Sequence, residues 1–299
     1  MLQQFNPENE KILVYIDGKL YPREEAKVSV FDSVVQGGDA VWEGIRVYDG
    51  RIFCLDRHLE RLQNSAHALA FNDVPDNKTI TEAIFETLKA NQMKDGVHIR
   101  LTLTRGRKTT SGMDPRLNQF GPTLIVLAEW KPPVYPPSIT LVTSSVRRNA
   151  PMFLDSKIHH NNLLNNILAK IEANHAGADA GVMLDKDGYV SEANGVNLFC
   201  VRNGVVYTPH ADSCLPGITR GLVIEICQKN AIPIVEKNLS ITEFYIADEV
   251  FTSGTMGELT KVVEIDGRKI INKTETSLLD SINGLFHRLT EEWGEPLPF

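Results

Sequence analysis

Long hydrophobic runs are absent from this sequence of 299 residues. Its longest apolar stretches, such as LIVLA at residues 124–128, are far too short to cross a bilayer as a helix. The first residues, MLQQFNPENEK, are polar and mixed in charge, so they lack the basic and then apolar layout of a secretory signal. We therefore expect no membrane-spanning segment, no export and a cytoplasmic location.

Clusters of basic residues are also missing. No run of five or more Lys or Arg occurs, and the formal net charge is -7. Proteins that bind nucleic acid or anionic membranes through electrostatics carry a basic patch, and this sequence contains no such patch. Small molecules are the expected partners.

Cysteine is scarce and is not spaced for a metal or redox site. The four cysteines lie in apolar, strand-like or helix-like surroundings without a C-x-x-C spacing, at Cys54, Cys200, Cys214 and Cys227. The adjacent pair His159-His160 is a poor chelator, because neighbouring residues point to different sides of a helix or strand. We expect reduced core cysteines and no metal site.

Several common catalytic motifs are absent as well. The sequence contains no Gly-rich dinucleotide loop, no Walker lysine, no H-E-x-x-H and no G-x-S-x-G. These absences argue against dinucleotide-binding, P-loop, zinc-protease and serine-hydrolase chemistry.

Proline, in contrast, is concentrated in one segment. Residues 131–138, KPPVYPPS, hold four prolines, which exclude a helix or a central strand and favour an extended connector. The chain is long enough for two domains of ordinary size. We predict a small N-terminal domain over 1–130, a linker over 131–138 and a larger C-terminal domain over 139–299.

Both predicted domains combine hairpins with amphipathic helices. Turn-forming pairs flanked by β-rich residues predict hairpins at Asp17-Gly18, Asp49-Gly50, Asp187-Gly188, Asn203-Gly204 and Asp266-Gly267. Apolar residues at helical spacing predict helices from near Asp56 to Leu69, Thr79 to Asn91, Asn162 to Asn174 and Glu275 to Trp293. Because strands and helices mix without a regular βαβ alternation, we predict an α+β fold with antiparallel-rich sheets.

Two segments resemble phosphate cradles. Residues 215–220, LPGITR, come directly before an apolar helical run, and a helix N-terminus offers unpaired N–H donors to an anion. Residues 252–258, TSGTMGE, follow a strand-like segment. Taken alone, ordinary loop and cap chemistry is the simpler explanation of both.

Six segments together resemble one family, the class IV aminotransferases of pyridoxal-phosphate fold type IV, and they occur in the family's order. They are VWEGIR at 41–46, HLERL at 58–62, LDSK at 154–157, VSEANGVNLF at 190–199, LPGITR at 215–220 and residues 247–258. This family includes branched-chain aminotransferases, D-amino acid transaminases and aminodeoxychorismate lyases. The resemblance implies a two-domain enzyme that uses pyridoxal 5′-phosphate.

The resemblance also implies roles for individual residues. Lys157 matches the lysine that forms a Schiff base with the cofactor and later transfers protons, Glu192 the carboxylate that pairs with the ring nitrogen, and Arg61 the arginine that binds the phosphate. A lysine in this role needs desolvation or nearby cations, because a free amine is protonated near neutral pH. Without the motif, Lys157 and Arg61 would be read as solvated residues and Glu192 as an exposed strand glutamate.

The remaining implied cofactor contacts bind the phosphate. Ile218 and Thr219 match positions whose backbone N–H groups hold it, and Thr255 matches another contact. In the family the active site also includes residues from a second subunit, so the resemblance implies a homodimer with its active sites at the interface.

The substrate positions match the branched-chain subgroup best. Arg100 matches an arginine of the substrate pocket, residues like those near Met256 present N–H groups to the substrate carboxylate, and Trp42 also falls in a substrate-contacting segment. The implied reaction is a ping-pong exchange of an amino group between an amino acid, branched-chain favoured, and a 2-oxo acid such as 2-oxoglutarate.

Other positions depart from that subgroup. Leu163 stands where branched-chain enzymes usually carry a tyrosine. The loop DPRLNQF at 114–120 is closer to D-amino acid transaminases, in which an arginine and a histidine trap the substrate carboxylate; Arg116 keeps the first and Asn118 replaces the second. A solvated loop arginine would look the same. D-Amino acid transamination is therefore the second hypothesis, followed by the lyase and by a non-catalytic homologue that only binds the cofactor.

Overall fold

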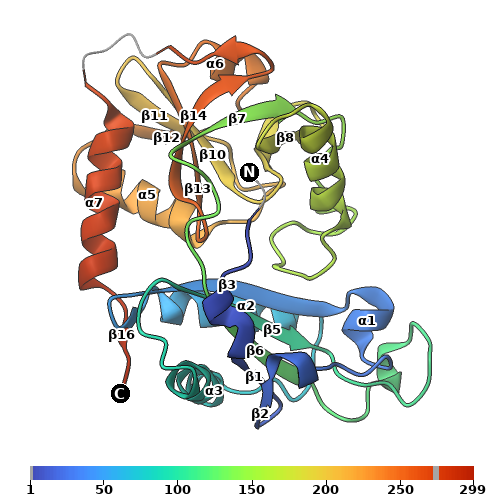
Figure 1. The fold of residues 1–299 in the computed structure, drawn as a ribbon. Coiled ribbons are helices and arrows are strands. Elements are labelled where there is room, and N and C mark those ends of the chain that lie inside the picture. The colour runs from blue at the N-terminus through green and yellow to red at the C-terminus, as the bar shows by residue number, and fades with distance from the viewer. Residues whose placement is uncertain (1–2, 272–275) are drawn as a thin grey trace. The chain divides into compact units, whose positions relative to one another are not determined.

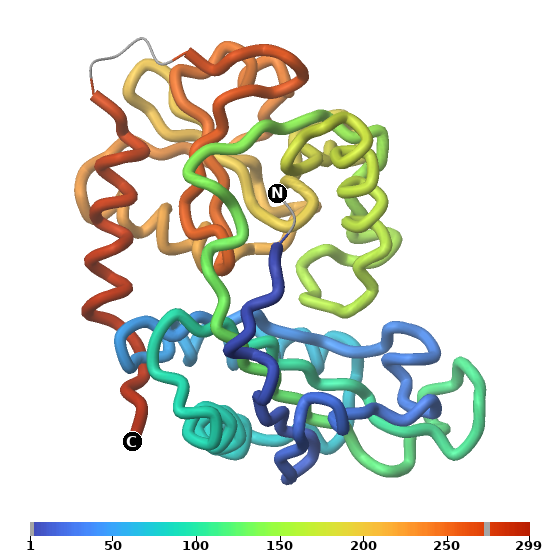
Figure 2. The backbone as a smooth tube through the Cα atoms, viewed as in Figure 1, coloured from blue at the N-terminus to red at the C-terminus, as the bar shows by residue number. Residues whose placement is uncertain are grey.

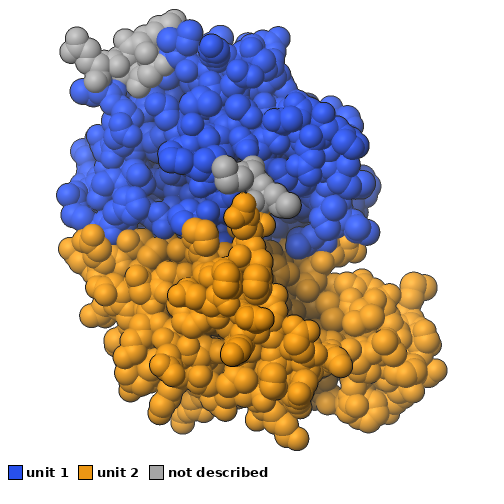
Figure 3. Space-filling view, in the orientation of Figure 1, with its two compact units in different colours: residues 1–2, 133–157, 163–289 blue, residues 3–132, 158–162, 290–299 orange. Residues whose placement is uncertain are grey.

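The computed structural model describes residues 3–271 and 276–299, which form two compact units (Figure 3). Unit 1 contains Pro133–Lys157 and Leu163–Leu289, and unit 2 contains Gln3–Pro132, Ile158–Asn162 and Thr290–Phe299. In the described part of the chain, no helix is both long and apolar enough to span a membrane.

Unit 2 is built on a seven-stranded antiparallel sheet in the order β16-β4-β3-β5-β6-β1-β2 (Figure 1). Its strands are β1 (Leu13–Ile16), β2 (Lys19–Pro22), β3 (Ala40–Tyr48), β4 (Arg51–Ile52), β5 (Val97–Thr104), β6 (Thr123–Trp130) and β16 (Glu295–Pro296). Its α-helices are α1 (Ser33–Gly37), α2 (Leu55–Ala68) and α3 (Asn77–Ala90), and three short 3-10 helices cover Pro7–Lys11, Arg23–Glu25 and Pro115–Leu117.

The two long helices of unit 2 follow their sequence patterns. The apolar stripe of α2 is buried, including Leu55, Leu59 and Leu62, and it shares one core with β3 and β5. Helix α3 begins where the Asp76 carboxylate accepts a hydrogen bond from the Thr79 N–H at 2.8 Å, which caps an otherwise unpaired donor. Both predicted helices are confirmed, with their ends shifted by one or two residues.

Unit 1 is built on a mixed nine-stranded sheet in the order β12-β11-β10-β13-β14-β7-β8-β9, with β15 paired to β14 (Figure 1). Its strands are β7 (Ser138–Thr143), β8 (Ala180–Leu184), β9 (Val190–Ala193), β10 (Asn197–Arg202), β11 (Val205–Thr208), β12 (Ile234–Glu236), β13 (Glu249–Gly254), β14 (Glu258–Ile265) and β15 (Arg268–Lys269). Its helices are α4 (Leu164–His175), α5 (Ile218–Lys229), α6 (Ile241–Tyr245) and α7 (Leu278–Glu292), the last of which ends in unit 2. The start of the helix predicted from Glu275 lies outside the described residues.

All five predicted turns lie between antiparallel strands. In four of them both residues have positive φ, as at Asp17 (φ 46°) and Gly18 (φ 82°), which is the backbone that a type I′ turn requires. The fifth, at Asp187-Gly188, is part of a longer loop between β8 and β9. Antiparallel pairs dominate both sheets, so the predicted α+β class is confirmed.

The chain passes between the units more often than one linker allows, as the trace in Figure 2 can be followed by residue number. After the proline-rich segment it returns to unit 2 at residues 158–162, where His160 forms an antiparallel bridge with Val41 of β3. It returns again at its end, where β16 pairs with β4. The first return begins directly after Lys157.

Candidate active site

Lys157 is the last residue of unit 1 before the chain passes to unit 2. Its side chain is exposed, and Nζ donates a long hydrogen bond of 3.4 Å to the backbone oxygen of Asp212. The desolvation expected for this lysine is therefore not provided by the protein alone. An accessible amine is open to a carbonyl compound that enters the site.

Glu192 lies on β9, whose residues are all buried, and is itself only 5% exposed. Arg148 Nε donates to Glu192 Oε1 over 2.5 Å, and Asn197 Nδ2 donates to Oε2 over 3.2 Å. Burial raises the pKa of this carboxyl and outweighs the lowering effect of Arg148. An anion whose burial is incompletely compensated is stabilised further by a second positive charge nearby.

Helix α5 presents its N-terminus without a side-chain cap. Its N-cap is Gly217, no side chain bonds to the first N–H groups, and Thr219 in the first turn is buried. A Cβ at Gly217 would lie 2.2 Å from Asn197 Oδ1, so the tight approach of this loop requires glycine. Uncapped donors at a helix N-terminus are the groups that bind phosphate.

One loop, residues 209–217, connects these three features. Its backbone oxygens accept hydrogen bonds from Lys157 Nζ at Asp212, from Ser191 Oγ at Ser213 over 2.9 Å, and from Asn197 Nδ2 at Leu215 over 3.0 Å. The loop then leads directly into α5. Unit 1 therefore brings together the predicted lysine, the strand of the predicted carboxylate and the predicted phosphate cradle.

The second predicted cradle is the turn between β13 and β14. Its strand β13 pairs with β10, with Ser253 opposite Asn197, and the turn contains Thr255 and Met256. The proline-rich segment supports this turn, because Val134 N–H donates to Met256 O over 2.9 Å and the Tyr135 ring packs on Gly257.

Arg61 is located on α2 in unit 2, where it contacts a buried carboxylate. Its Nε and Nη2 donate to Glu43 Oε1 and Oε2 over 2.8 and 2.7 Å. The same carboxylate accepts from His58 Nδ1 at 2.6 Å and from His159 Nδ1 at 3.1 Å. Glu43 itself is fully buried.

The charges in this cluster follow from burial and contact. Burial alone would raise the pKa of Glu43, but His159, Arg61 and His58 outweigh it and hold the pKa well below its ordinary value. Burial lowers the pKa of His159 to about 4, against the raising effect of Glu43, so its ring is neutral at pH 7. No sequence motif indicates that Glu43 is a shared acceptor.

Trp42 and Arg100 lie on the opposite face of the same sheet from Glu43, because successive residues of a strand alternate between faces. The Arg100 guanidinium lies 3.5 Å from the Trp42 ring centroid, and its hydrogen-bond partner is Asn161 Oδ1 at 3.5 Å. Burial lowers the pKa of Arg100 to about 10. Among the described residues no carboxylate pairs with this cation, so it is available to an acidic ligand.

Two further residues on this face were missed by the motif analysis. His98 and Arg46 face each other across β5 and β3, and each has a buried nitrogen, Nε2 and Nε respectively, without a hydrogen-bond partner in the described structure. Burial, with nearby Lys131 and Arg46, lowers the pKa of His98 to about 3. Unpaired buried nitrogens beside Arg100 extend the polar surface that an acid could contact.

The two remaining sequence-derived positions offer less. Arg116 is exposed and its guanidinium is paired with Asp114, two residues away, while Asn118 Nδ2 donates to Gly106 O over 2.6 Å. Leu163 precedes α4 and provides no hydroxyl.

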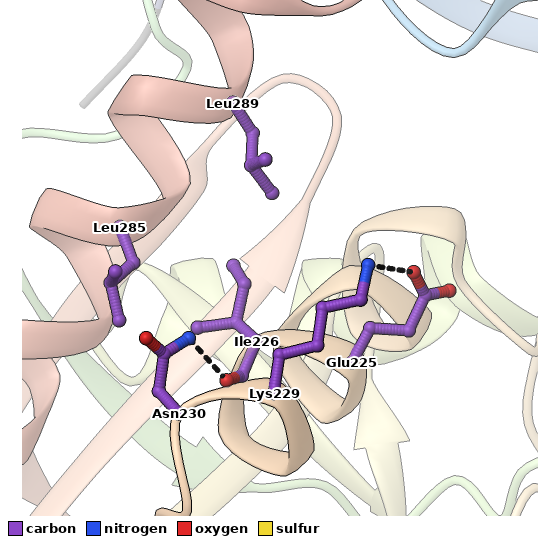
Figure 4. A pocket seen from close by; sticks show the side chains of 6 residues that line it. All are labelled: Glu225, Ile226, Lys229, Asn230, Leu285 and Leu289. Carbon is purple, nitrogen blue, oxygen red and sulfur yellow. Dashed lines mark hydrogen bonds and ion pairs between the residues drawn. The ribbon is translucent and has the colours of Figure 1, made fainter.

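A separate hollow lies between α5 and α7 and is lined by Glu225, Ile226, Lys229, Asn230, Leu285 and Leu289 (Figure 4). Its polar groups are occupied with each other, as Lys229 Nζ lies 3.9 Å from Glu225 Oε2 and Asn230 Nδ2 donates to Ile226 O over 2.8 Å. None of the sequence-derived site residues lines it.

Comparison with known proteins agrees with this geometry. The family model of amino-transferase class IV matches residues 40–265. Branched-chain-amino-acid aminotransferase-like protein 1 of Arabidopsis thaliana is 58% identical over 98% of this chain, and a putative branched-chain-amino-acid aminotransferase of Methanocaldococcus jannaschii is 41% identical over 94%. The chain spans 53% of the Arabidopsis protein and 97% of the archaeal one.

A solved structure shows the same fold. The branched-chain aminotransferase of the thermophilic archaeon Thermoproteus uzoniensis, solved with norvaline, superposes with a TM-score of 0.88 at 30% identity. The match covers 96% of this chain and 99% of that one. Sequence, family model and fold agree, and this chain belongs to the class IV aminotransferases.

Proposed function

We propose that this protein is a pyridoxal 5′-phosphate-dependent aminotransferase that moves an amino group between an amino acid, branched-chain favoured, and a 2-oxo acid such as 2-oxoglutarate. The observation that carries the proposal is the 209–217 loop, which joins Lys157, the strand of Glu192 and the N-terminus of α5 within unit 1. Lys157 and Glu192 are both present, which disfavours a non-catalytic homologue.

The residues fit the chemical groups of this cofactor. An aldehyde needs an accessible amine, which Lys157 offers; a ring nitrogen needs a buried anion, which Glu192 offers; a phosphate needs free N–H donors and a cation. We assign the phosphate to the N–H groups of Ile218 and Thr219, with Arg61 and Thr255 as further contacts.

When bound, the cofactor supplies an electron sink for negative charge at the substrate Cα. Lys157 Nζ then removes the proton from Cα in one half-reaction and delivers a proton to it in the other, so one base serves both directions. Glu192 favours a protonated ring nitrogen because it is a buried anion next to it.

Two groups of residues are proposed to bind the substrate. Backbone N–H groups near Met256 bind the α-carboxylate, supported by the turn's attachment to Val134. Arg100 on Trp42, with Arg46 and His98 beside it, binds acidic groups because it is a partly desolvated cation without a carboxylate partner in the described structure. A donor such as leucine and an acceptor such as 2-oxoglutarate would use this polar and aromatic surface in turn.

The relatives favour branched-chain substrates. A bacterial-type branched-chain amino acid aminotransferase with a TM-score of 0.87 and 33% identity to this chain has been solved with pyridoxamine 5'-phosphate and with 4-methylvaleric acid, an acid of branched-chain shape. The D-amino acid alternative is not favoured: Arg116, its proposed carboxylate trap, is paired with Asp114, and Asn118 is bonded to Gly106 O.

We further propose a homodimer with active sites at the interface. Helix α4 supports this proposal, because Leu164, Ile167, Leu168 and Ile171 are all at least 44% exposed and recur at helical spacing on one face. A second copy of the chain would cover them. A cytoplasmic location is supported by the four free, buried cysteines.

A half-reaction experiment tests the function. Purified protein loaded with cofactor is mixed separately with L-leucine, L-glutamate, D-alanine and D-glutamate, and loss of the cofactor's visible absorbance is followed. We expect loss with L-leucine and L-glutamate and none with the D-amino acids. Loss with the D-amino acids alone would establish the second hypothesis, and pyruvate release from aminodeoxychorismate without transamination would establish the lyase.

A further inference from the structure

Two adjacent arginines follow β7, and they have different environments. Arg147 is exposed, with Nη1 3.3 Å from the backbone oxygens of Ser144 and Ser145. Arg148 is 6% exposed, and its backbone N–H donates to Leu184 O over 2.9 Å. The pair therefore separates the effect of a buried charge from that of an arginine at the surface.

The buried arginine is the cation that contacts Glu192. Its Nε donates to Glu192 Oε1 over 2.5 Å and its Nη1 to Asn165 Oδ1 over 3.1 Å, and both ion-pair side chains are 6% exposed. A buried carboxylate that loses its cation takes up a proton, because desolvation disfavours the charged form. Arg148 therefore controls whether Glu192 carries a charge.

The other oxygen of Glu192 is held by a neutral group. Asn197 Nδ2 donates to Oε2 over 3.2 Å and to Leu215 O over 3.0 Å, so the same amide contacts the loop before α5. Cys214 lies nearby, but burial raises the pKa of its thiol to about 12 and it carries no charge at neutral pH. Neither neighbour replaces the charge of Arg148.

We propose that Arg148 is a positioning residue that holds Glu192 as an oriented anion for the ring nitrogen of the cofactor, while Asn197 fixes that anion relative to the phosphate cradle. The inference rests on the proposed function, because the ring nitrogen belongs to the cofactor assigned there. Arg148 acts through Glu192 and does not itself contact the cofactor.

The test compares the affinity for pyridoxal 5′-phosphate with that for its 1-deaza analogue, in which carbon replaces the ring nitrogen. The ratio of the two dissociation constants isolates the contact between Glu192 and the ring nitrogen, since every other contact is common to both ligands. A purely structural defect weakens both ligands equally and leaves the ratio unchanged. Binding is measured with full-length apoprotein by quenching of tryptophan fluorescence.

We expect the wild-type protein to prefer pyridoxal 5′-phosphate and Arg148→Gln to lose at least about tenfold of that preference. The matched control Arg147→Gln keeps the wild-type ratio, and Arg148→Lys keeps part of it because it retains the charge without the planar fork. A wild-type ratio in folded Arg148→Gln would overturn the proposal. Wild-type protein that binds no pyridoxal 5′-phosphate would instead overturn the proposed function.

If Arg148→Gln does not fold, the pH dependence of the ratio in Arg148→Lys decides the question. The preference disappears as Glu192 is protonated, and a lysine stabilises the anion less well, so its loss should occur at higher pH than in the wild type. Loss at the same pH in both proteins would contradict the assignment.

Discussion

The Glu43 carboxylate tests how much unit 2 depends on one buried anion. Replacing it with glutamine preserves size but removes the charge, and it directs an amide NH2 group toward the donors of Arg61, His58 and His159. Removing one partner of a buried, hydrogen-bonded charge network typically costs about 3–5 kcal/mol. We expect the free energy of unfolding of unit 2 to fall by that amount in Glu43→Gln.

The same network predicts a pH dependence. Because the pKa of Glu43 is held well below its ordinary value, the stabilisation is fully present above the ordinary glutamate pKa and is lost as the pH falls through the lowered one. The difference between wild type and Glu43→Gln should therefore be largest at neutral pH and shrink in strong acid.

Urea unfolding followed by tryptophan fluorescence measures this effect selectively. All three tryptophans, at positions 42, 130 and 293, belong to unit 2. The control Glu60→Gln removes an exposed glutamate from the same helix as Arg61, and it should change stability by no more than about 0.5 kcal/mol. Equal stability of Glu43→Gln and wild type at pH 7 would refute the reasoning.

Three further predictions concern the cofactor site and one loop. Glu192→Gln should reduce turnover far more than cofactor affinity, because it weakens the electron sink while the phosphate contacts remain; steady-state kinetics and a cofactor titration measure both. Gly217→Ala should weaken cofactor binding about tenfold or more, because its Cβ would lie 2.2 Å from an amide oxygen, whereas Gly221→Ala in open space on the same helix should not. Gly106→Ala should destabilise unit 2 by about 1–3 kcal/mol in the urea assay, because the residue has φ +97° and a Cβ would lie 1.8 Å from a backbone oxygen.

Local signals in the sequence predicted local structure well. The Asp-Gly and Asn-Gly pairs specify their turns because the required positive φ is a property of those residues alone. The stripe of α2 predicted its buried face for the same reason. The five-residue helices α1 and α6 carry no periodic signal, because each is little more than one turn long.

Contacts between distant segments could not be predicted in this way. Glu43 reads as an ordinary strand glutamate, and its partner His159 is 116 residues away. Arg147 and Arg148 are identical in sequence terms, and only the fold decides which one is buried. The family resemblance supplied the cofactor residues, but it did not supply the residues that hold them.

The central claim is that Lys157 binds the cofactor covalently. Reduction of the cofactor-loaded protein with borohydride, followed by proteolysis and mass spectrometry, locates any cofactor fixed to a lysine. We predict the added mass on the peptide that contains Lys157, and a Lys157→Ala protein that is colourless, unlabelled and inactive in transamination. Label on a different lysine, or full activity of Lys157→Ala, would contradict the account.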